Sequence, residues 1–423
     1  MRILRKFTEI YDSGEIYLLL LGSICGVLIV AFQCCRTEFQ LDFIRIVPLL
    51  LIGLSLFFSL KRKCVPAVFR LAFIGVMYII LAYLAWPTRL DWVEWHDQAH
   101  YLRMVNELSH GYLTSDSFRY GLGYPILSVP FYFLMGKDAL FIPNLAAFAG
   151  TLYFSYLLFC SLTNELKAKV SLLFIIFATT LPYHHVIWWS HGIAIFCLVF
   201  LFYLALNPLT DTRLLLAGLV IGYAFFTRYI EIMIFLPIIL YILWRTKLRG
   251  LALMTVGVMP FIAVTFTAQR LVFGDWFMTP YEIRFGLPTK IFWLERIPRN
   301  FFLTFLYFPK DLAMDINGML KVTVLISAFY VIFAPMGAYL LYRSSKDKKG
   351  LTIAMITSVI SCILYATSYY QFDSGTFGQF PADFRYLLLS YPYVVFFSII
   401  GLLTFIKTST ESKSQVQKNR AYE

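Results

Sequence analysis

The 423-residue sequence carries too few charged residues to cover the surface of a soluble protein. Charged residues make up 14% and hydrophobic residues 60% of the chain, whereas soluble domains carry about 25% charged residues. The net charge of +12 is the excess of Lys and Arg expected on the cytoplasmic side of a membrane protein. Composition therefore excludes a soluble globular fold. The sequence contains no Walker or Rossmann motif for a nucleotide, and nothing in it indicates nucleic-acid binding.

Apolar runs predict about twelve transmembrane helices. They cover residues 15–35, 44–60, 67–87, 139–160, 168–183, 187–206, 213–227, 229–245, 251–272, 319–343, 351–370 and 384–406. Their lengths approach the ~20 residues needed to cross ~30 Å of hydrocarbon. The first run lacks a small-residue cleavage site, so we expect a retained helix rather than a cleaved signal. The predicted fold is an all-α integral membrane protein in which residues 1–423 form a single polytopic domain.

Clusters of basic residues predict the orientation of these helices. If the N-terminus is cytoplasmic and the helices alternate, every compact basic cluster falls on the cytoplasmic side, as the positive-inside bias requires. These clusters include residues 61–63, 245–249 and 343–349 and the cytoplasmic tail 407–423. Residues 88–138 and 273–318 then form two long external loops. The alternative is that residues 213–245 form one long kinked helix, which would reverse the orientation of everything that follows.

The first external loop contains the pattern of a surface helix. Leu102, Val105 and Leu108 recur at helical spacing, which indicates a short amphipathic helix lying along the membrane surface. Asp97 precedes this pattern at the position of an N-cap. Glycine and proline residues follow the helix, and the apolar run at 126–134 is too short to span a bilayer. We expect that run to be re-entrant or interfacial.

A series of short motifs begins in this loop and continues to the end of the apolar region. The motifs are Asp97-Gln98 before Tyr101, Asn144 to Gly150, Ser190-His191-Gly192, Gly218 to Gly222 before Thr227-Arg228, and Phe377-Gly378 with Phe384-Arg385-Tyr386 and Pro392. In this order they resemble the GT-C glycosyltransferases. The most similar branch is the dolichyl-phosphate-mannose–protein mannosyltransferase-like one, which includes bacterial enzymes that use polyprenyl-phosphate sugars. The resemblance covers roughly residues 67–406, but Gln98 stands where the family has Glu and two extra spans precede the loop.

The resemblance implies an inverting glycosyltransferase that moves a sugar from a polyprenyl-phosphate donor to an acceptor on the non-cytoplasmic face. Such an enzyme needs a carboxylate that takes the proton of the acceptor. The resemblance assigns this role to Asp97, which the sequence independently places at the head of the surface helix. Glu94 and Asp116 are secondary candidates. The alternative for Asp97 is that it only caps the helix.

The departing lipid phosphate needs a cation, for which Arg228 is the first candidate. It lies with Glu231 between two apolar spans, where a charge is costly and usually functional. The alternative is an ion pair between these two residues, one helical turn apart. Further candidates for substrate binding are Tyr101, His191, Arg284, Arg299 and Arg385.

The histidines of the external face raise the question of a metal site. His96 and His100 flank Asp97 at helical spacing, and His184-His185 would be able to complete a ligand shell. However, His-Asp-x-x-His is not a recognised zinc signature. The sequence therefore assigns no cofactor, and a divalent metal bound by His96 and His100 is kept as an alternative.

Two other classes of membrane protein share some of these features. A transporter or flippase for a lipid-linked glycan would bind its solute near the bilayer midplane and show internal repeats, and no repeat is found here. An O-antigen polymerase or ligase also uses large external loops. The expected partners of a transferase are a polyprenyl-phosphate-linked sugar, a lipid, glycan or protein acceptor, and membrane lipids. We expect a bacterial inner-membrane location, both termini in the cytoplasm and a periplasmic active site.

Overall fold

The computed structural model describes residues 67–85, 97–177, 179, 181–280, 297–298, 317–345, 347–368 and 384–420, and these residues are helical or lie in turns between helices. The helices are α3 (Ala67–Ala85), α4 (Asp97–Ser109), α5 (Gly123–Met135), η2 (Gly136–Leu140), α6 (Phe141–Leu162), α7 (Glu165–Phe177), α8 (Leu181–Val186), α9 (His191–Leu206), α10 (Asp211–Arg228), η3 (Tyr229–Glu231), α11 (Ile232–Phe273), α14 (Asn317–Ser344), α15 (Lys349–Ser368), η6 (Phe384–Ser390) and α16 (Tyr391–Arg420). Among the described residues there is no strand, in agreement with the predicted all-α class.

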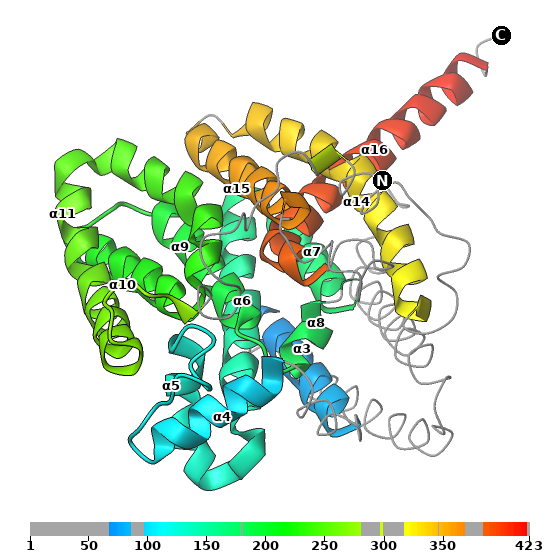
Figure 1. Ribbon diagram of the computed structural model, residues 1–423. Helices are drawn as coiled ribbons and strands as arrows, with labels where there is room; N and C mark the ends of the chain where they lie inside the picture. Colours follow the sequence, from blue (N-terminus) through cyan, green and yellow to red (C-terminus); the bar gives the residue numbers. More distant parts are fainter. Residues whose placement is uncertain are drawn as a thin grey trace.

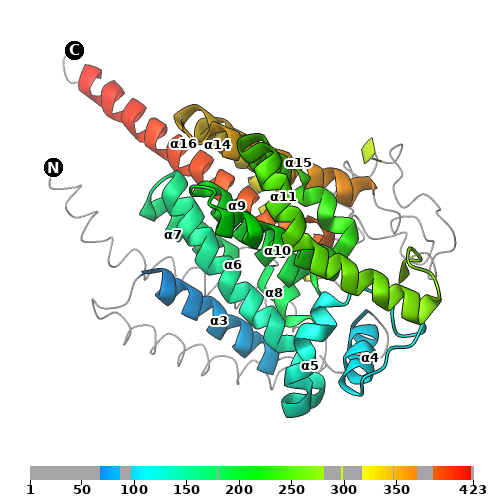
Figure 2. The ribbon, with the colours of Figure 1, turned by 90° about the vertical axis from the view of Figure 1, so that its left-hand side faces the viewer.

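Helices α6 and α9 pack against each other in the interior of the bundle. Helix α9 is apolar on every side and most of its residues are buried, as expected for a helix that other helices surround. In Figure 1, α10 and α11 lie on the left-hand side of the molecule, and in Figure 2 they face the viewer. Helices α14 and α16 pack against each other. Helices α4 and α5 cover one end of the bundle.

Four helical segments within the described residues are long and apolar enough to cross a membrane. They are Gly123–Leu162, Asp211–Phe273, Lys349–Ser368 and Leu387–Ile406. Leu71–Ile80 and His191–Leu206 are shorter apolar stretches. The protein is thus a helical membrane protein, but the predicted number of twelve spans is not confirmed. The predicted spans 15–35 and 44–60 lie outside the described residues, and α7 contains only 13 residues.

Helices α10 and α11 show whether residues 213–245 form one long kinked helix. The backbone leaves helical geometry at Arg228 (φ −152°, ψ 81°), and α11 breaks again at Lys247 (φ 54°, ψ −138°). Arg249 then forms an ion pair with Asp211 at 2.5 Å, a contact that one continuous helix would not allow because its residues would rise ~1.5 Å each. The chain therefore folds back as separate segments, and the single kinked helix is not observed.

The two ends of the bundle differ in their polar side chains. At one end the Arg249–Asp211 pair lies at the start of α10, and Lys348 Nζ donates to the carbonyl oxygen of Ser161 at the end of α6 (2.5 Å). At the other end lie α4, the first turn of α9 and Arg228. Helix α10 has 18 residues, so these two ends are separated by about 27 Å.

The predicted helix after Asp97 is present as α4, with a different buried face. Helix α4 buries Tyr101, Met104 and Val105, while Leu102 and Leu108 are only partly buried. The apolar run that follows forms α5, a 13-residue helix.

The other two predicted regions are described only in part. Most of the predicted second external loop lies outside the described residues. The predicted tail forms the end of α16, which continues as a helix to Arg420. This end of α16 projects from the body in Figure 1.

Candidate functional site

An aromatic cluster holds Asp97 at the head of α4. The hydroxyl of Tyr120 donates a hydrogen bond to Asp97 Oδ1 at 2.5 Å. The ring of Tyr120 stacks on that of Tyr101, with 4.8 Å between ring centroids. Tyr124 meets Tyr101 edge-on at 5.1 Å. Because the three rings are buried, the donor to Asp97 is fixed in position by packing.

Tyr101 connects α4 to the helical bundle. Its hydroxyl forms a hydrogen bond with Ser190 Oγ at 2.8 Å. Burial raises the pKa of Tyr101 to about 12, and the positive charge of Arg228 opposes this rise. Tyr101 therefore stays protonated and neutral at physiological pH, so it remains able to donate or accept a hydrogen bond.

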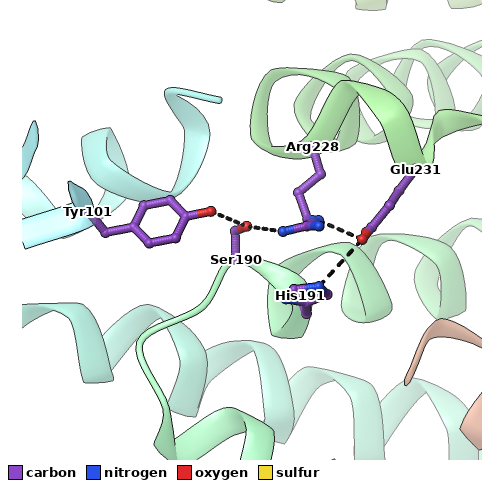
Figure 3. A network of polar contacts seen from close by, with 5 residues as sticks. All are labelled: Tyr101, Ser190, His191, Arg228 and Glu231. Atoms are coloured by element: carbon purple, nitrogen blue, oxygen red, sulfur yellow. Dashed lines mark hydrogen bonds and ion pairs between the residues drawn. The ribbon is translucent and has the colours of Figure 1, made fainter. Parts of the chain in front are cut away.

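Five residues form the Arg228 cluster, which Figure 3 shows from close by: Tyr101, Ser190, His191, Arg228 and Glu231. Arg228 Nη1 donates to Ser190 Oγ at 3.1 Å, and Arg228 Nε lies 2.6 Å from Glu231 Oε1. His191 Nε2 approaches the same carboxylate oxygen at 3.6 Å. The side chain of Arg228 is 12% exposed and that of Glu231 only 1%. The cluster is therefore a nearly dry charge pair with polar neighbours.

The chain builds this cluster from three helix ends. Ser190 and His191 begin α9, Arg228 ends α10, and η3 turns the chain so that Glu231 faces back toward Arg228. An arginine at a helix C-terminus is also favoured by the helix dipole. Residues far apart in sequence thus meet because three helices end at the same level of the bundle.

Glycines bring the loop after α4 against the end of α10. A Cβ on Gly121 would lie 2.4 Å from the carbonyl oxygen of Thr227, and a Cβ on Gly123 would lie 2.2 Å from its hydroxyl oxygen. Tyr223 donates from its hydroxyl to the carbonyl oxygen of Gly123 at 2.9 Å. The glycines that interrupt the helical pattern in the sequence are therefore points of close approach. They place Tyr120, and with it Asp97, next to the residue before Arg228.

The structure brings together several of the predicted site residues. They are Asp97, Tyr101, His191, Arg228 and Glu231, with Tyr120 and Ser190 as connecting residues. The alternative ion pair of Arg228 with Glu231 is also present. Asp116 is exposed, and its carbonyl oxygen accepts from Arg119 Nε at 3.0 Å.

Other predicted residues are not placed in this cluster. Glu94, His96, Arg284 and Arg299 lie outside the described residues. Arg385 falls in η6, with its side chain outside the described part.

The histidines near the site make aromatic contacts. His184 stacks on Trp189 at 5.4 Å, His185 lies against Phe148 at 4.8 Å, and His100 lies 6.2 Å from Tyr120. Within the described part of the chain, no three His, Cys, Asp or Glu side chains gather closely enough to hold a metal ion. The idea that His184 and His185 complete a metal shell therefore finds no cluster among these residues.

Glu107 is a buried carboxylate that the sequence analysis missed. It accepts hydrogen bonds from the backbone N–H of Thr114 at 2.8 Å and from the hydroxyls of Thr114 and Ser117. This carboxylate fixes the turn that leads to Tyr120. Its partners lie seven and ten residues further on, so no local spacing rule identifies it.

Tyr120 and Ser190 were also missed as site residues. Ser190 had a sequence signal, since it directly precedes His191 where an apolar span begins.

The arrangement offers a carboxylate with a fixed donor and a guanidinium with a buried counter-ion, joined by hydroxyl groups. A comparison of the chain with models of known families and with characterised proteins found no match.

Proposed function

We propose that the protein is an inverting glycosyltransferase that takes a sugar from a polyprenyl phosphate. The observation that supports this proposal is the link between Asp97 and Arg228. Contacts through Tyr120, Tyr101 and Ser190 join the carboxylate of the surface helix to the guanidinium at the end of α10. An acid for the acceptor and a cation for the phosphate are the two groups that this reaction requires. The order of motifs that resembles the GT-C enzymes supports the same proposal.

In the proposed reaction, an acceptor hydroxyl oxygen attacks C1 of the sugar from the side opposite the phosphate. The new bond joins the acceptor oxygen to C1, the bond between C1 and the phosphate oxygen breaks, and its electron pair leaves with the phosphate. Asp97 takes the acceptor proton. Tyr120 orients the carboxylate by donating to one of its oxygens, and the other oxygen faces the acceptor.

Arg228 binds the phosphate as negative charge develops on it. In the structure, Arg228 Nη1 donates to the neutral hydroxyl of Ser190, and a phosphate oxygen is a stronger acceptor for a guanidinium. Glu231 holds the opposite edge of the guanidinium through Nε, and His191 contacts the same carboxylate. In this proposal Glu231 and His191 therefore act by orienting Arg228 rather than by touching the sugar.

The proposed site lies at the end of the bundle opposite the basic contacts of Arg249 and Lys348. If positive residues mark the cytoplasmic side, this end faces the periplasm of a bacterial inner membrane, where a polyprenyl chain enters from the outer leaflet. A transporter would place its ionisable residues near the midplane. The position of the Arg228 cluster at a helix end favours the transferase. The acceptor in this proposal is a lipid, a glycan or a protein.

The test compares purified wild type with Asp97→Asn for release of polyprenyl phosphate from a donor carrying a labelled sugar. We expect a loss of at least about 100-fold in Asp97→Asn, the contribution of a general base. Asp116→Asn is the matched control, because it removes an exposed carboxylate from the same loop, and it should retain the wild-type rate. Equal rates in wild type and Asp97→Asn would show that Asp97 is not the base.

A further inference from the structure

Gln98 is a buried amide beside the proposed base, and it has no hydrogen bond to the described residues. Its side chain is 3% exposed, and neither Oε1 nor Nε2 has a hydrogen-bond partner among the described residues. Folded proteins pair nearly all buried polar groups, because leaving one unpaired costs free energy. An amide with both ends unpaired is therefore best explained by a ligand that pairs with it.

The position of Gln98 places this amide within the proposed site. Gln98 directly follows Asp97 in α4, and Tyr101 lies three residues after Gln98, so the side chains of Gln98 and Tyr101 share one face of the helix. Asp97 contacts Tyr120, and Tyr101 reaches Ser190 of the Arg228 cluster. The amide thus lies next to the proposed base in sequence and on the face of α4 that carries Tyr101, whose hydroxyl contacts the Arg228 cluster.

The residues next to Gln98 in α4 reach solvent. Asp97, Ala99 and His100 are each partly exposed, while Gln98 itself is buried. Side-chain rotations commonly accompany ligand binding. In this proposal a ligand contacts the amide after such a rotation of the neighbouring side chains.

We propose that Gln98 binds hydroxyl groups of the sugar that is transferred, an inference that rests on the proposed function. A carboxamide presents one acceptor and one donor side by side, and each sugar hydroxyl both donates and accepts. Two neighbouring hydroxyls on a pyranose or furanose ring therefore satisfy both ends of the amide. A phosphate would pair only with the donor, and an isoprenoid chain would pair with neither.

The test measures binding, so that it does not depend on turnover. Purified protein is titrated with polyprenyl-phosphate mannose, polyprenyl-phosphate glucose, polyprenyl-phosphate arabinose and sugar-free polyprenyl phosphate. We expect wild type to bind at least one sugar-bearing lipid about tenfold more tightly than the sugar-free lipid, the size of one or two net hydrogen bonds. Gln98→Leu should lose this gain while keeping its affinity for the sugar-free lipid.

Two further variants control for effects on folding. Gln269→Leu removes the side chain of another buried glutamine, on α11, whose Oε1 also lacks a partner among the described residues, and it should keep the sugar-dependent gain. Gln98→Met replaces the amide with an unbranched apolar chain and should repeat the result of Gln98→Leu. If one Gln98 variant fails to bind the sugar-free lipid, the other variant is used to measure the sugar-dependent gain.

The inference is overturned if the folded Gln98 variants keep the sugar-dependent gain, or if wild type binds all four lipids equally. These outcomes are separate from the test of the proposed function. A sugar-dependent gain that Gln98 controls, together with full turnover in Asp97→Asn, would support the sugar site and remove the transferase mechanism. Loss of turnover in Asp97→Asn, together with an unchanged sugar-dependent gain in the Gln98 variants, would retain Asp97 as the base and remove Gln98 from sugar binding.

Discussion

Arg228 and Glu231 form a charge pair that solvent hardly reaches. Taking two charges out of water is costly, and their attraction repays this cost only when both are present and well aligned. Such a pair contributes little net stability compared with apolar residues, yet removal of one partner leaves the other charge buried and alone. Sequence reasoning offered the ion pair and phosphate binding as alternatives. In this geometry the two are compatible, because Nε contacts Glu231 while Nη1 contacts only a hydroxyl.

A double-mutant cycle tests this pair. We expect Arg228→Gln and Glu231→Gln each to lower stability by roughly 3 kcal/mol, and the double variant to lose less than the sum. Thermal unfolding in detergent measures the change. The control is Glu165→Gln, which removes a more exposed pair with Lys169 (3.1 Å; exposed fractions 60% and 20%) and should cost less than about 1 kcal/mol. Additive effects in the cycle would show that the two side chains do not interact.

We expect protonation of His185 to make the stability of the protein depend on pH. Its Nδ1 bonds the carbonyl oxygen of Leu181 at 2.8 Å, and burial lowers its pKa from 6.5 to about 4. Above pH 6.5 the imidazole is neutral in both the folded and the unfolded states. As the pH falls toward 4, only the unfolded state takes up a proton, so stability decreases and then levels off.

The expected loss from this histidine is at most about 3 kcal/mol. His185→Phe keeps an aromatic ring beside Phe148 but does not titrate, so its melting temperature should fall less between pH 6.5 and 4 than that of wild type. His110→Phe, at an exposed position, should follow the wild-type curve. A parallel fall in wild type and His185→Phe would assign the pH dependence to other groups.

At the scale of elements, glycines determine how closely α10 and α11 pack. A Cβ on Gly257 would lie 2.5 Å from the carbonyl oxygen of Leu215 and 2.7 Å from the backbone nitrogen of Leu219. Gly218 makes a similar approach to Met254 of α11. Small residues allow such contact between membrane helices, where packing rather than the hydrophobic effect drives association.

Gly257→Ala should therefore separate the two helices and lower the melting temperature. The contacts involve backbone atoms that cannot rotate away, so we expect a loss of about 1–3 kcal/mol, as for other overpacked sites. The neighbouring Val256 is 61% exposed, and Val256→Leu is the matched control with no expected change. Equal melting temperatures for wild type and Gly257→Ala would contradict the close crossing.

Helix α4 shows how much of an element the sequence predicts. Its existence and its start near Asp97 follow from local spacing and an acidic first turn. Its buried face does not, because the buried side chain of Tyr101 bonds Ser190 at the start of another helix, whereas Leu102 is only partly buried. The helical pattern identifies the apolar residues of the helix, and tertiary contacts decide which of its residues become buried.

The sequence identified charged members of the candidate site but not the residues that connect them. Arg228 and Glu231 are conspicuous because charges between apolar spans are rare. Tyr120, Ser190 and Glu107 are ordinary polar residues in sequence, and they matter only because helix ends converge on them. The predicted lengths of the spans were less successful, since α7 and α9 have only 13 and 16 residues.

For the whole molecule, the two ends of the bundle carry different chemistry. One end holds basic residues that contact helix ends, as Arg249 does with the first residue of α10 and Lys348 with Ser161 at the end of α6. The other end holds the Arg228 cluster (Figure 3), to which α4 contributes Tyr101. The proposed transferase requires such a difference between the ends, because its lipid substrate would be presented on one side of the membrane only. The proposed function therefore depends on which end faces outward.

Labelling of single cysteines tests this orientation. Asp116 and Asp347 are both exposed aspartates, Asp116 in the loop after α4 and Asp347 beside Lys348 at the opposite end. In a background whose seven native cysteines are replaced, a membrane-impermeant maleimide applied to spheroplasts should label Asp116→Cys and spare Asp347→Cys, because basic ends stay cytoplasmic. Permeabilised cells should label both. The opposite pattern would place Asp97 on the cytoplasmic side, where a donor lipid presented in the outer leaflet would be out of its reach.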